Sequence, residues 1–449
     1  MIPETRCSRR RFLAATTTAV ATPLILPSHV WAAPVKPNDR ISLGFIGVGI
    51  QNRGLLNGFI NRNDTHVVAV CDVDTSRRVD TKSRVDRHYF KRDGATDNAC
   101  AAYNAFEDLL ARKDVDAVVI ATPDHWHALI TLAAARAKKD VYCEKPLCQS
   151  IHEARAMVNA VRKHKRVFQT GSMQRSAREF RVAVELIRNG VIGTVRKVDV
   201  AVGGPGVPCD LPEEPMEPGL DWDRWLGPAP LRPYNAILSP RGINSHFPMW
   251  RAYREYGGGM VTDWGAHHFD IAQWGLDADS GGPVEIIPPG NWLKAQSGVK
   301  IRYGNGVEVT HQAGNGVTFH GQGGELHINR GRIAVKVGDT VKGKAGDKGD
   351  APLKDVLDRL EAEFLGAGKQ QVYRSANHLG DFLDAMRKRS QPICDVEVGA
   401  RSVSVCHLVN LAYYHGQTLK WDAKSEQFTG GTGNKAWLDV SYRGPWKLG

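Results

Sequence analysis

One stretch near the start of the chain, residues 41–54, restricts the fold more than any other. An apolar strand, Ile41–Ile46, leads straight into a loop that contains Gly47 and Gly49, and a segment with helical character follows. A second apolar strand then ends in Asp72. In such a unit the first glycine permits a tight turn, and the second lets a pyrophosphate reach the backbone amides at the start of the helix. The stretch therefore predicts a dinucleotide-binding unit.

The acid that ends the second strand indicates which dinucleotide. Asp72 lies about 20 residues beyond the loop, where a carboxylate accepts hydrogen bonds from the adenosine ribose and repels a 2′-phosphate. We therefore expect NAD rather than NADP, held by Gly47, Gly49, Ile50 and Asp72. The loop departs from the usual G-x-G-x-x-G because Asn52 stands in place of the third glycine. An ordinary strand-to-helix turn is the alternative.

The composition is that of a two-domain globular enzyme. The 449 residues are 42% hydrophobic and 24% charged, and a chain of this length exceeds what one core usually holds. Residues 1–32 contribute +3 of the net charge of +11, which leaves +8 for the remainder. No basic run is interleaved with aromatic residues, so we expect no nucleic-acid partner.

Residues 1–32 have the pattern of an export signal. Residues 8–13 are SRRRFL, a modest apolar stretch covers residues 13–26, and residues 30–32 offer a cleavage site. Paired arginines before Phe-Leu are typical of a bacterial twin-arginine signal, and an ordinary secretory signal is the alternative. The apolar stretch is too short to span a membrane and contains Pro23. We expect a periplasmic or otherwise exported protein without an integral membrane segment in the mature chain.

The rest of the chain divides into two regions and a tail. We expect a Rossmann domain at 39–170, a substrate and oligomerisation domain at 171–425 and a tail at 426–449. In the first region apolar strands (117–123, 141–143 and 167–169) alternate with helical patterns (126–138 and 151–164), which predicts a parallel, doubly wound sheet.

The second region has a different pattern. Strands at 195–202, 299–303, 307–312, 324–329 and 332–337 are punctuated by glycine, which predicts a mostly antiparallel sheet. Residues 203–219 are a Pro/Gly-rich loop and residues 338–352 a charged loop, while residues 377–389 and 399–414 are expected to be helical.

Two constellations carry chemistry. The first is Glu144-Lys145-Pro146, which follows a buried strand at the edge of the sheet where ligands bind. A surface lysine is the alternative. The second lies in residues 257–270, where a helix that begins just before Asp263 would place Asp263, His267 and Asp270 on one face.

A carboxylate beside an imidazole fixes its tautomer and raises its basicity, as a general base requires. The alternative for Asp263 is a simple helix N-cap, and His268 is expected to be a packed core residue. His125 and His127 could join His267 as metal ligands, but no further ligand at helical spacing supports such a site, and we expect no metal.

Together these motifs resemble the glucose–fructose oxidoreductase / inositol dehydrogenase / rhizopine-catabolism (Gfo/Idh/MocA) family. The likeness covers the mature chain from about Asp39 to about Tyr414 and rests on the glycine loop, Thr122-Pro123 with His127, Glu144-Lys145-Pro146, and the Asp263-x-x-x-His267 helix. The resemblance implies an α/β protein in which a Rossmann domain precedes a second α/β domain with a large, mostly antiparallel open sheet that builds dimers or tetramers.

The resemblance also implies roles for individual residues. The catalytic residues would be Lys145, Asp263 and His267. Thr122, Pro123, His127, Glu144 and Lys145 would join the cofactor-binding residues. The Gly171–Arg175 loop looks like the family's substrate-side loop, which would add Gln174 and Arg175 to His267 as substrate residues.

From the residues and the resemblance together we expect an NAD(P)-dependent oxidoreductase that acts on a CH–OH group. His267, oriented by Asp263, would take the hydroxyl proton of a sugar or polyol while Lys145 stabilises the oxyanion. Because an exported enzyme has no evident cofactor pool, the nicotinamide is expected to be tightly bound. Two alternatives are a redox-neutral NAD-dependent glycoside hydrolase or lyase that acts through a transient ketosugar, and a non-catalytic sugar- or cofactor-binding protein.

Overall fold

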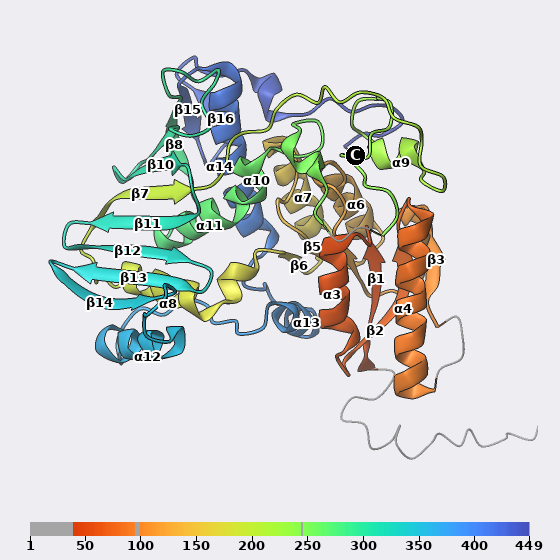
Figure 1. Ribbon diagram of the computed structural model, residues 1–449, viewed down its shortest axis with the longest axis horizontal. Helices are drawn as coiled ribbons and strands as arrows, with labels where there is room; N and C mark the ends of the chain where they lie inside the picture. The colour runs from red at the N-terminus through yellow and green to blue at the C-terminus, as the bar shows by residue number, and fades with distance from the viewer. Residues whose placement is uncertain (1–38, 95–98, 244–245, 449) are drawn as a thin grey trace, which may run out of the picture. The chain divides into compact units, whose positions relative to one another are not determined.

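The computed structural model of the chain describes residues 39–94, 99–243 and 246–448 (Figure 1). The expected export signal at residues 1–32 lies outside this part of the chain. Two β-sheets organise the fold, one of six strands and one of ten. Among the described residues, no helix combines the length and apolar character that a bilayer span would need.

The first sheet is fully parallel, with the strand order β3-β2-β1-β4-β5-β6. Its strands are β1 (Ile41–Ile46), β2 (Thr65–Cys71), β3 (Ala101–Tyr103), β4 (Ala117–Ile120), β5 (Asp140–Cys143) and β6 (Phe168–Thr170). The direction of progression reverses between β1 and β4, and a crevice at the carboxyl ends of the strands is expected there. The predicted doubly wound sheet is confirmed.

Helices cover both faces of this sheet. They are α3 (Ile50–Ile60), α4 (Thr75–Asp93), α5 (Phe106–Leu110), α6 (Asp124–Arg136), α7 (Ile151–Lys163), α13 (His378–Lys388) and α14 (Val396–His415). On one face Phe45 packs in a cluster with Phe59 of α3 and Phe382 of α13. On the other, Val118 shares a cluster with Val403 of α14. Helices from the C-terminal part of the chain therefore complete the N-terminal domain.

The second sheet has the order β14-β13-β12-β11-β7-β10-β9-β8-β15-β16, and only β7 and β10 pair in parallel. Its strands are β7 (Val195–Ala201), β8 (Pro283–Ile287), β9 (Lys300–Tyr303), β10 (Glu308–Gln312), β11 (Gly316–Gly321), β12 (Gly324–Asn329), β13 (Arg332–Val337), β14 (Thr340–Ala345), β15 (Leu419–Asp422) and β16 (Gln427–Thr429). The predicted mostly antiparallel second sheet is confirmed.

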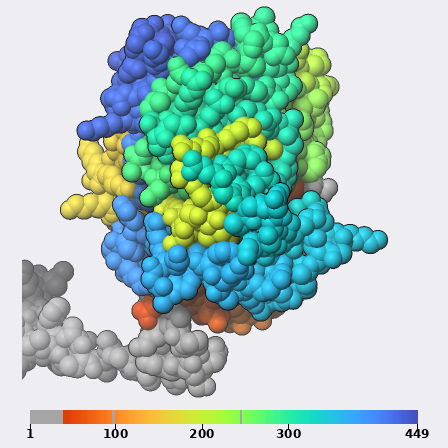
Figure 2. All heavy atoms as spheres, turned by 90° about the vertical axis from the view of Figure 1, so that its left-hand side faces the viewer, coloured from red at the N-terminus to blue at the C-terminus, as the bar shows by residue number. Residues whose placement is uncertain are grey.

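One face of the second sheet packs against helices. These are α8 (Arg178–Arg188), α11 (Gly265–Gly275), α12 (Leu353–Phe364) and part of α14. Along β7, Val198 and Val200 are buried in that core, while Lys197 and Asp199, which alternate with them, pair on the opposite face. Figure 2 shows the residues of this sheet in yellow-green to cyan at the surface, with the light-blue α12 region below them. The dimer or tetramer expected from the resemblance stays a prediction.

The predicted loop at 338–352 is wrong in its first half, because β14 pairs with β13 there. Gly338, at φ +55°, turns the chain into the hairpin. Gly343 faces α12 so closely that an added Cβ would lie 2.9 Å from Val356. The glycines and lysines that indicated a loop therefore belong to a strand, in which the glycine faces a helix and the lysines face solvent.

Residues 203–259, called the covering segment below, connect β7 to α10 (Met260–Asp263). Between these two elements the segment contacts the first sheet. The segment's described residues, 203–243 and 246–259, are mostly irregular and include α9 (Trp222–Leu226) and the 3₁₀ turn η3 (Met249–Ala252). The amide of Asp221 donates to the carbonyl of Val73 at 3.0 Å, and that of Thr75 to Gly219 at 3.0 Å. It therefore crosses the end of β2 and the start of α4, and Figure 1 shows α9 near that edge. Two further 3₁₀ turns are η2 (Met173–Ser176) and η4 (Lys435–Leu438).

Candidate active site

The glycine loop between β1 and α3 has the geometry of a phosphate cradle. Gly47 has φ +75°, and an added Cβ would lie 2.7 Å from Thr122, so this position requires glycine. Gly49 caps α3, and a Cβ added there would meet nothing within 4 Å. The helix N-terminus is thus open to a ligand, as a pyrophosphate requires.

Asn52 explains the departure from the usual glycine motif. Its side chain is 1% exposed, and its amide donates to the carbonyl of Gly47 at 2.8 Å. The asparagine therefore ties the first turn of α3 to the glycine loop.

Asp72 stands where the sequence predicted it, directly after β2. Its carboxylate accepts from the amide of Val48 at 2.8 Å and from that of Asp74 at 2.9 Å. Burial raises the pKa of this carboxyl, although Arg77 and the two amides oppose the shift. Asp72 thus braces the glycine loop as well as facing the cleft.

Two adjoining cavities bring the predicted cofactor residues together. A cavity of about 100 Å³ is lined by Gly47, Gly49, Ile50, Asp72, Thr122 and Pro123. A larger cavity of about 960 Å³ is lined by His127, Glu144, Lys145, Gln174, Asp263 and His267. The two share lining residues, among them Gln51 and Arg251. The glycine loop fits the adenosine and pyrophosphate of NAD, and the larger cavity lies beyond it.

His127 and Glu144 support the loop that carries Lys145. The His127 ring lies 2.9 Å from the carbonyl of Pro146 and 3.0 Å from that of Thr122, and burial lowers the pKa of this histidine to about 4. Glu144 is buried against Gly171, where an added Cβ would lie 2.7 Å from the carboxyl. Burial also raises the pKa of Glu144. Both residues hold the strand ends together.

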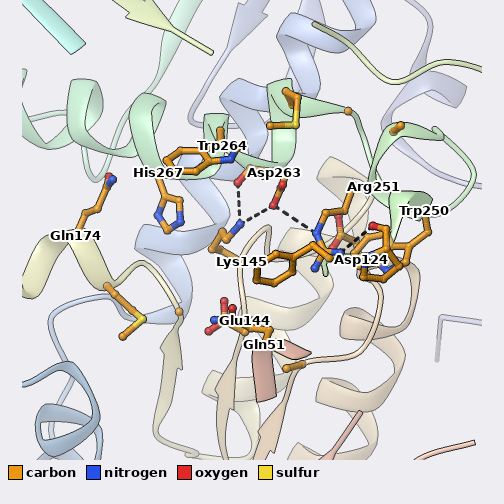
Figure 3. Close-up of a pocket in the computed structure, with 18 of the residues that line it drawn as sticks. Gln51, Asp124, Glu144, Lys145, Gln174, Trp250, Arg251, Asp263, Trp264 and His267 are labelled. Carbon is orange, nitrogen blue, oxygen red and sulfur yellow. Dashed lines mark hydrogen bonds and ion pairs between the residues drawn. The ribbon is translucent and has the colours of Figure 1, made fainter. Parts of the chain in front are cut away.

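Lys145 is fixed by Asp263. Its ammonium lies 2.6 Å from the Asp263 carboxylate and 2.9 Å from the main-chain carbonyl of the same residue (Figure 3). Arg251 approaches the carboxylate at 3.8 Å. Burial alone would raise the pKa of Asp263, but the charges of Lys145 and Arg251 hold it below its usual value.

His267 lies beside this pair without bonding to it, contrary to the expected Asp263–His267 contact. The predicted single helix is wrong, since α10 ends at Asp263 and α11 begins at Gly265. The amide of His267 bonds to the carbonyl of Trp264, and the carbonyl and carboxylate of Asp263 both accept from Lys145 instead.

The His267 ring is 5% exposed, and no described residue hydrogen-bonds either nitrogen. Burial, with the charges of Lys145 and Arg330, lowers the pKa of His267 well below 6.5. The ring is therefore a neutral imidazole in the cavity wall.

The substrate-side loop divides into two roles. Gln174 lines the larger cavity at 3% exposure, and neither amide atom has a partner among the described residues. Figure 3 shows it on the His267 side of the cavity. Arg175 is not among the residues lining this cavity. Its buried guanidinium binds Asp270 at 2.8 Å and Asp279 at 2.7 Å, so its contacts are those of a structural ion pair, which also removes Asp270 from the predicted catalytic face.

Other predicted histidines are structural. His268 is buried, 2.9 Å from the carbonyl of Ala201, as expected of a core residue. His125 lies 2.9 Å from the carbonyl of Trp225. In the part of the chain that the structure describes, no three His, Cys, Asp or Glu side chains gather into a metal-binding group.

Sequence reasoning missed several lining residues of the larger cavity: Asp124, Trp250, Arg251, Trp264 and Arg330. Asp124 directly follows Thr122-Pro123 at a strand end, which could have drawn attention to it. Arg251 and Arg330 come from irregular segments, and nothing in their local pattern indicates where those segments fold.

Comparisons with known proteins agree with this architecture. Residues 41–172 match the NAD-binding Rossmann fold of the Gfo/Idh/MocA oxidoreductase family, and residues 206–448 match its C-terminal alpha/beta domain. The 1,5-anhydro-D-fructose reductase of Ensifer adhaerens is 29% identical over 340 residues, which cover 73% of this chain and 86% of that protein.

Two further similarities are more limited. A glycosyl hydrolase family 109 protein of Stenotrophomonas maltophilia is 32% identical over 139 residues, 30% of this chain and 29% of that protein. The crystal structure of aldose-aldose oxidoreductase from Caulobacter crescentus shares the fold, with a TM-score of 0.55, 18% identity and coverage of 85% of this chain and 99% of that one. Because the family match spans both domains, the chain belongs to the Gfo/Idh/MocA family of NAD-binding oxidoreductases.

Proposed function

We propose that this oxidoreductase transfers hydride between a hydroxyl-bearing carbon of a sugar or polyol and the nicotinamide of NAD. The observation that carries the proposal is one cavity in which the Lys145 ammonium, fixed by Asp263, lies beside the neutral, unpartnered imidazole of His267. The Ensifer and Caulobacter relatives are named for sugar substrates, which supports the same substrate class.

The cofactor residues fit NAD. The open space at Gly49 admits a pyrophosphate to the amides of α3, and the Asp72 carboxylate disfavours a 2′-phosphate. When bound, NAD supplies the hydride acceptor.

Residues of the chain itself take up the proton and stabilise the charge that its loss creates. His267 accepts the hydroxyl proton, because its lowered pKa leaves a lone pair free at neutral pH. Lys145 stabilises the negative charge that develops on the substrate oxygen. Asp263 is a positioning residue, since it holds the Lys145 ammonium at 2.6 Å.

His267→Ala tests this assignment. We expect turnover to fall by roughly 10²–10⁴-fold, the usual contribution of a general base, while the amount of bound NAD stays unchanged. Turnover is followed by absorbance of reduced nicotinamide, and NAD content by nucleotide released on acid denaturation. The exposed His152→Ala is the control. Turnover like that of the unmodified enzyme in His267→Ala would remove this residue from the mechanism.

A redox-neutral cycle is the second candidate, favoured by the covering segment. Arg224 and Trp225 of that segment line the smaller cavity together with the glycine loop, an arrangement that would retain NAD between turnovers. Oxidation of a sugar would acidify the neighbouring C–H, and elimination would then release the group on the other side of the glycosidic bond. Water would add to the resulting unsaturated ketosugar, and return of the hydride to the carbonyl would give the free sugar. The similarity to a glycosyl hydrolase family 109 protein supports this candidate. A ketosugar or lactone product indicates net oxidation, whereas a free reducing sugar indicates the cycle.

We also infer export by the twin-arginine route, on the basis of Arg9 and Arg10 before Phe12-Leu13. Joint Arg9→Lys and Arg10→Lys substitution should hold the protein in the cytoplasm, as cell fractionation would show. Arg6→Lys is the matched control, and unimpaired export of the doubly substituted chain would contradict the inference.

A further inference from the structure

Three polar groups in the larger cavity have no hydrogen-bond or ion-pair partner among the described residues. They are the Gln174 amide and the His267 ring, which are buried, and the Arg330 guanidinium, which is exposed; no described residue hydrogen-bonds or ion-pairs with these side chains. A buried polar group without a partner costs free energy. Gln174 and His267 therefore mark where a polar ligand would bind, and Arg330 adds an exposed cation to the lining of the same cavity.

Arg330 differs from the other cations of the cavity. Lys145 and Arg251 both approach the Asp263 carboxylate, at 2.6 and 3.8 Å. Arg330 instead projects from the turn between β12 and β13, with its guanidinium 4.7 Å from the centroid of the Trp264 ring. Of the three cations that line this cavity, Arg330 is the one that forms no ion pair with a carboxylate of the described residues.

A further carboxylate in the lining, that of Glu179, is already engaged. Glu179 also lines the cavity, and its carboxylate accepts from the amide of Gly331 at 3.3 Å. Glu179 therefore holds the turn next to Arg330 rather than the guanidinium itself, which stays available to a ligand.

Trp264 relates this guanidinium to the proposed chemistry. The tryptophan lies between Asp263 and His267 in the chain, at the break between α10 and α11. A guanidinium over its ring is limited in orientation. An anion bound by Arg330 would consequently place the attached sugar relative to both Lys145 and His267.

We propose that the substrate is a sugar that carries an anionic group, a carboxylate or a phosphate, bound by Arg330 over Trp264, with a sugar hydroxyl on the Gln174 amide. A guanidinium suits both oxyanions because its N–H groups bond two oxygens at once. This inference rests on the proposed function and names the class of its substrate.

Calorimetric titration of the NAD-loaded enzyme tests the proposal, with glucose, glucuronate and glucose 6-phosphate as probes. We expect one of the two anionic sugars to bind at least about tenfold more tightly than glucose, since hydrogen bonds to a charged group are worth that much or more. The tighter of the two distinguishes a carboxylate from a phosphate.

Arg330→Gln should weaken the preferred anionic sugar by roughly 10- to 100-fold and leave glucose unchanged. Arg332→Gln is the matched control, because Arg332 lies two residues away, is exposed and pairs with Asp347 at 3.2 Å. Equal binding of glucose and both anions, or equal effects of the two substitutions, would overturn the proposal.

The same samples separate this inference from the proposed function. Anion-selective binding without reduced nicotinamide supports the anion site and contradicts the oxidation. Reduction of NAD by glucose with no anion preference contradicts the anion site alone. If none of the three sugars binds, both are overturned.

Discussion

At the scale of single residues, the cavity shows what a motif can predict. Lys145, Asp263 and His267 all line the larger cavity, as their positions after strands and near a helix start indicated. Their pairing was not predictable, since it depends on whether the helix continues through Trp264. Next to this interruption Asp263 pairs with Lys145, and burial keeps His267 neutral, whereas a carboxylate partner would have made it more basic.

Asp263→Asn should separate positioning from base catalysis. The change removes the charge that fixes the Lys145 ammonium and keeps the side-chain shape, so we expect the rate of hydride transfer to fall by roughly 10²-fold with NAD content unchanged. Rapid-mixing measurement of a single turnover gives that rate. Asp279→Asn is the control, since Asp279 pairs with Arg175, which also binds Asp270. Similar losses in the two variants would indicate a general effect of removing a charge.

At the scale of elements, the glycine loop permits a matched comparison. Added Cβ atoms at Gly49 and at Gly54 of α3 both meet open space, but only Gly49 stands at the helix N-terminus where a pyrophosphate approaches. We expect Gly49→Ala to weaken NAD binding about tenfold or more. Gly54→Ala should leave NAD affinity unchanged and stabilise the helix by about 0.5–1 kcal/mol.

Titration of nucleotide-stripped protein with NAD gives the affinity, and urea unfolding gives the free energy of unfolding. If the two alanines affect NAD affinity alike, the cofactor does not approach Gly49 as proposed.

Elements whose own hydrophobic pattern indicates their structure were predicted correctly. The apolar strands β1, β2, β4, β5 and β6 are buried on both faces, which their uninterrupted hydrophobic runs indicate. β14 was missed because its glycine suits a strand only where that strand packs against α12, and its lysines only where they face solvent. The break between α10 and α11 was also missed, because residues 257–270 contain no proline that would indicate the end of a helix.

At the scale of the whole molecule, segments from three parts of the chain close the cofactor cleft. The carbonyl of Trp225 in α9 accepts from Trp126 of α6 at 3.1 Å. The C-terminal tail adds Trp446, whose ring lies 4.8 Å from that of Trp126, and Arg443, which donates to the carbonyl of Gly227 at 3.0 Å. No local pattern in the sequence indicated that the covering segment and the tail would meet over the Rossmann domain.

This arrangement predicts that the tail controls how long NAD stays bound. Arg443→Ala removes the bonds that hold the end of α9, while Trp225 and the catalytic residues are unaltered, so we expect NAD release to accelerate about tenfold with the rate of hydride transfer unchanged. Exchange of bound NAD against excess labelled NAD measures the release. Arg387→Ala is the control, because it removes an exposed arginine that pairs with Asp64 away from the cleft. If release is equally slow in both variants, the tail does not hold the covering segment closed, and retention of NAD must depend on the contacts that α4 and α6 make with it.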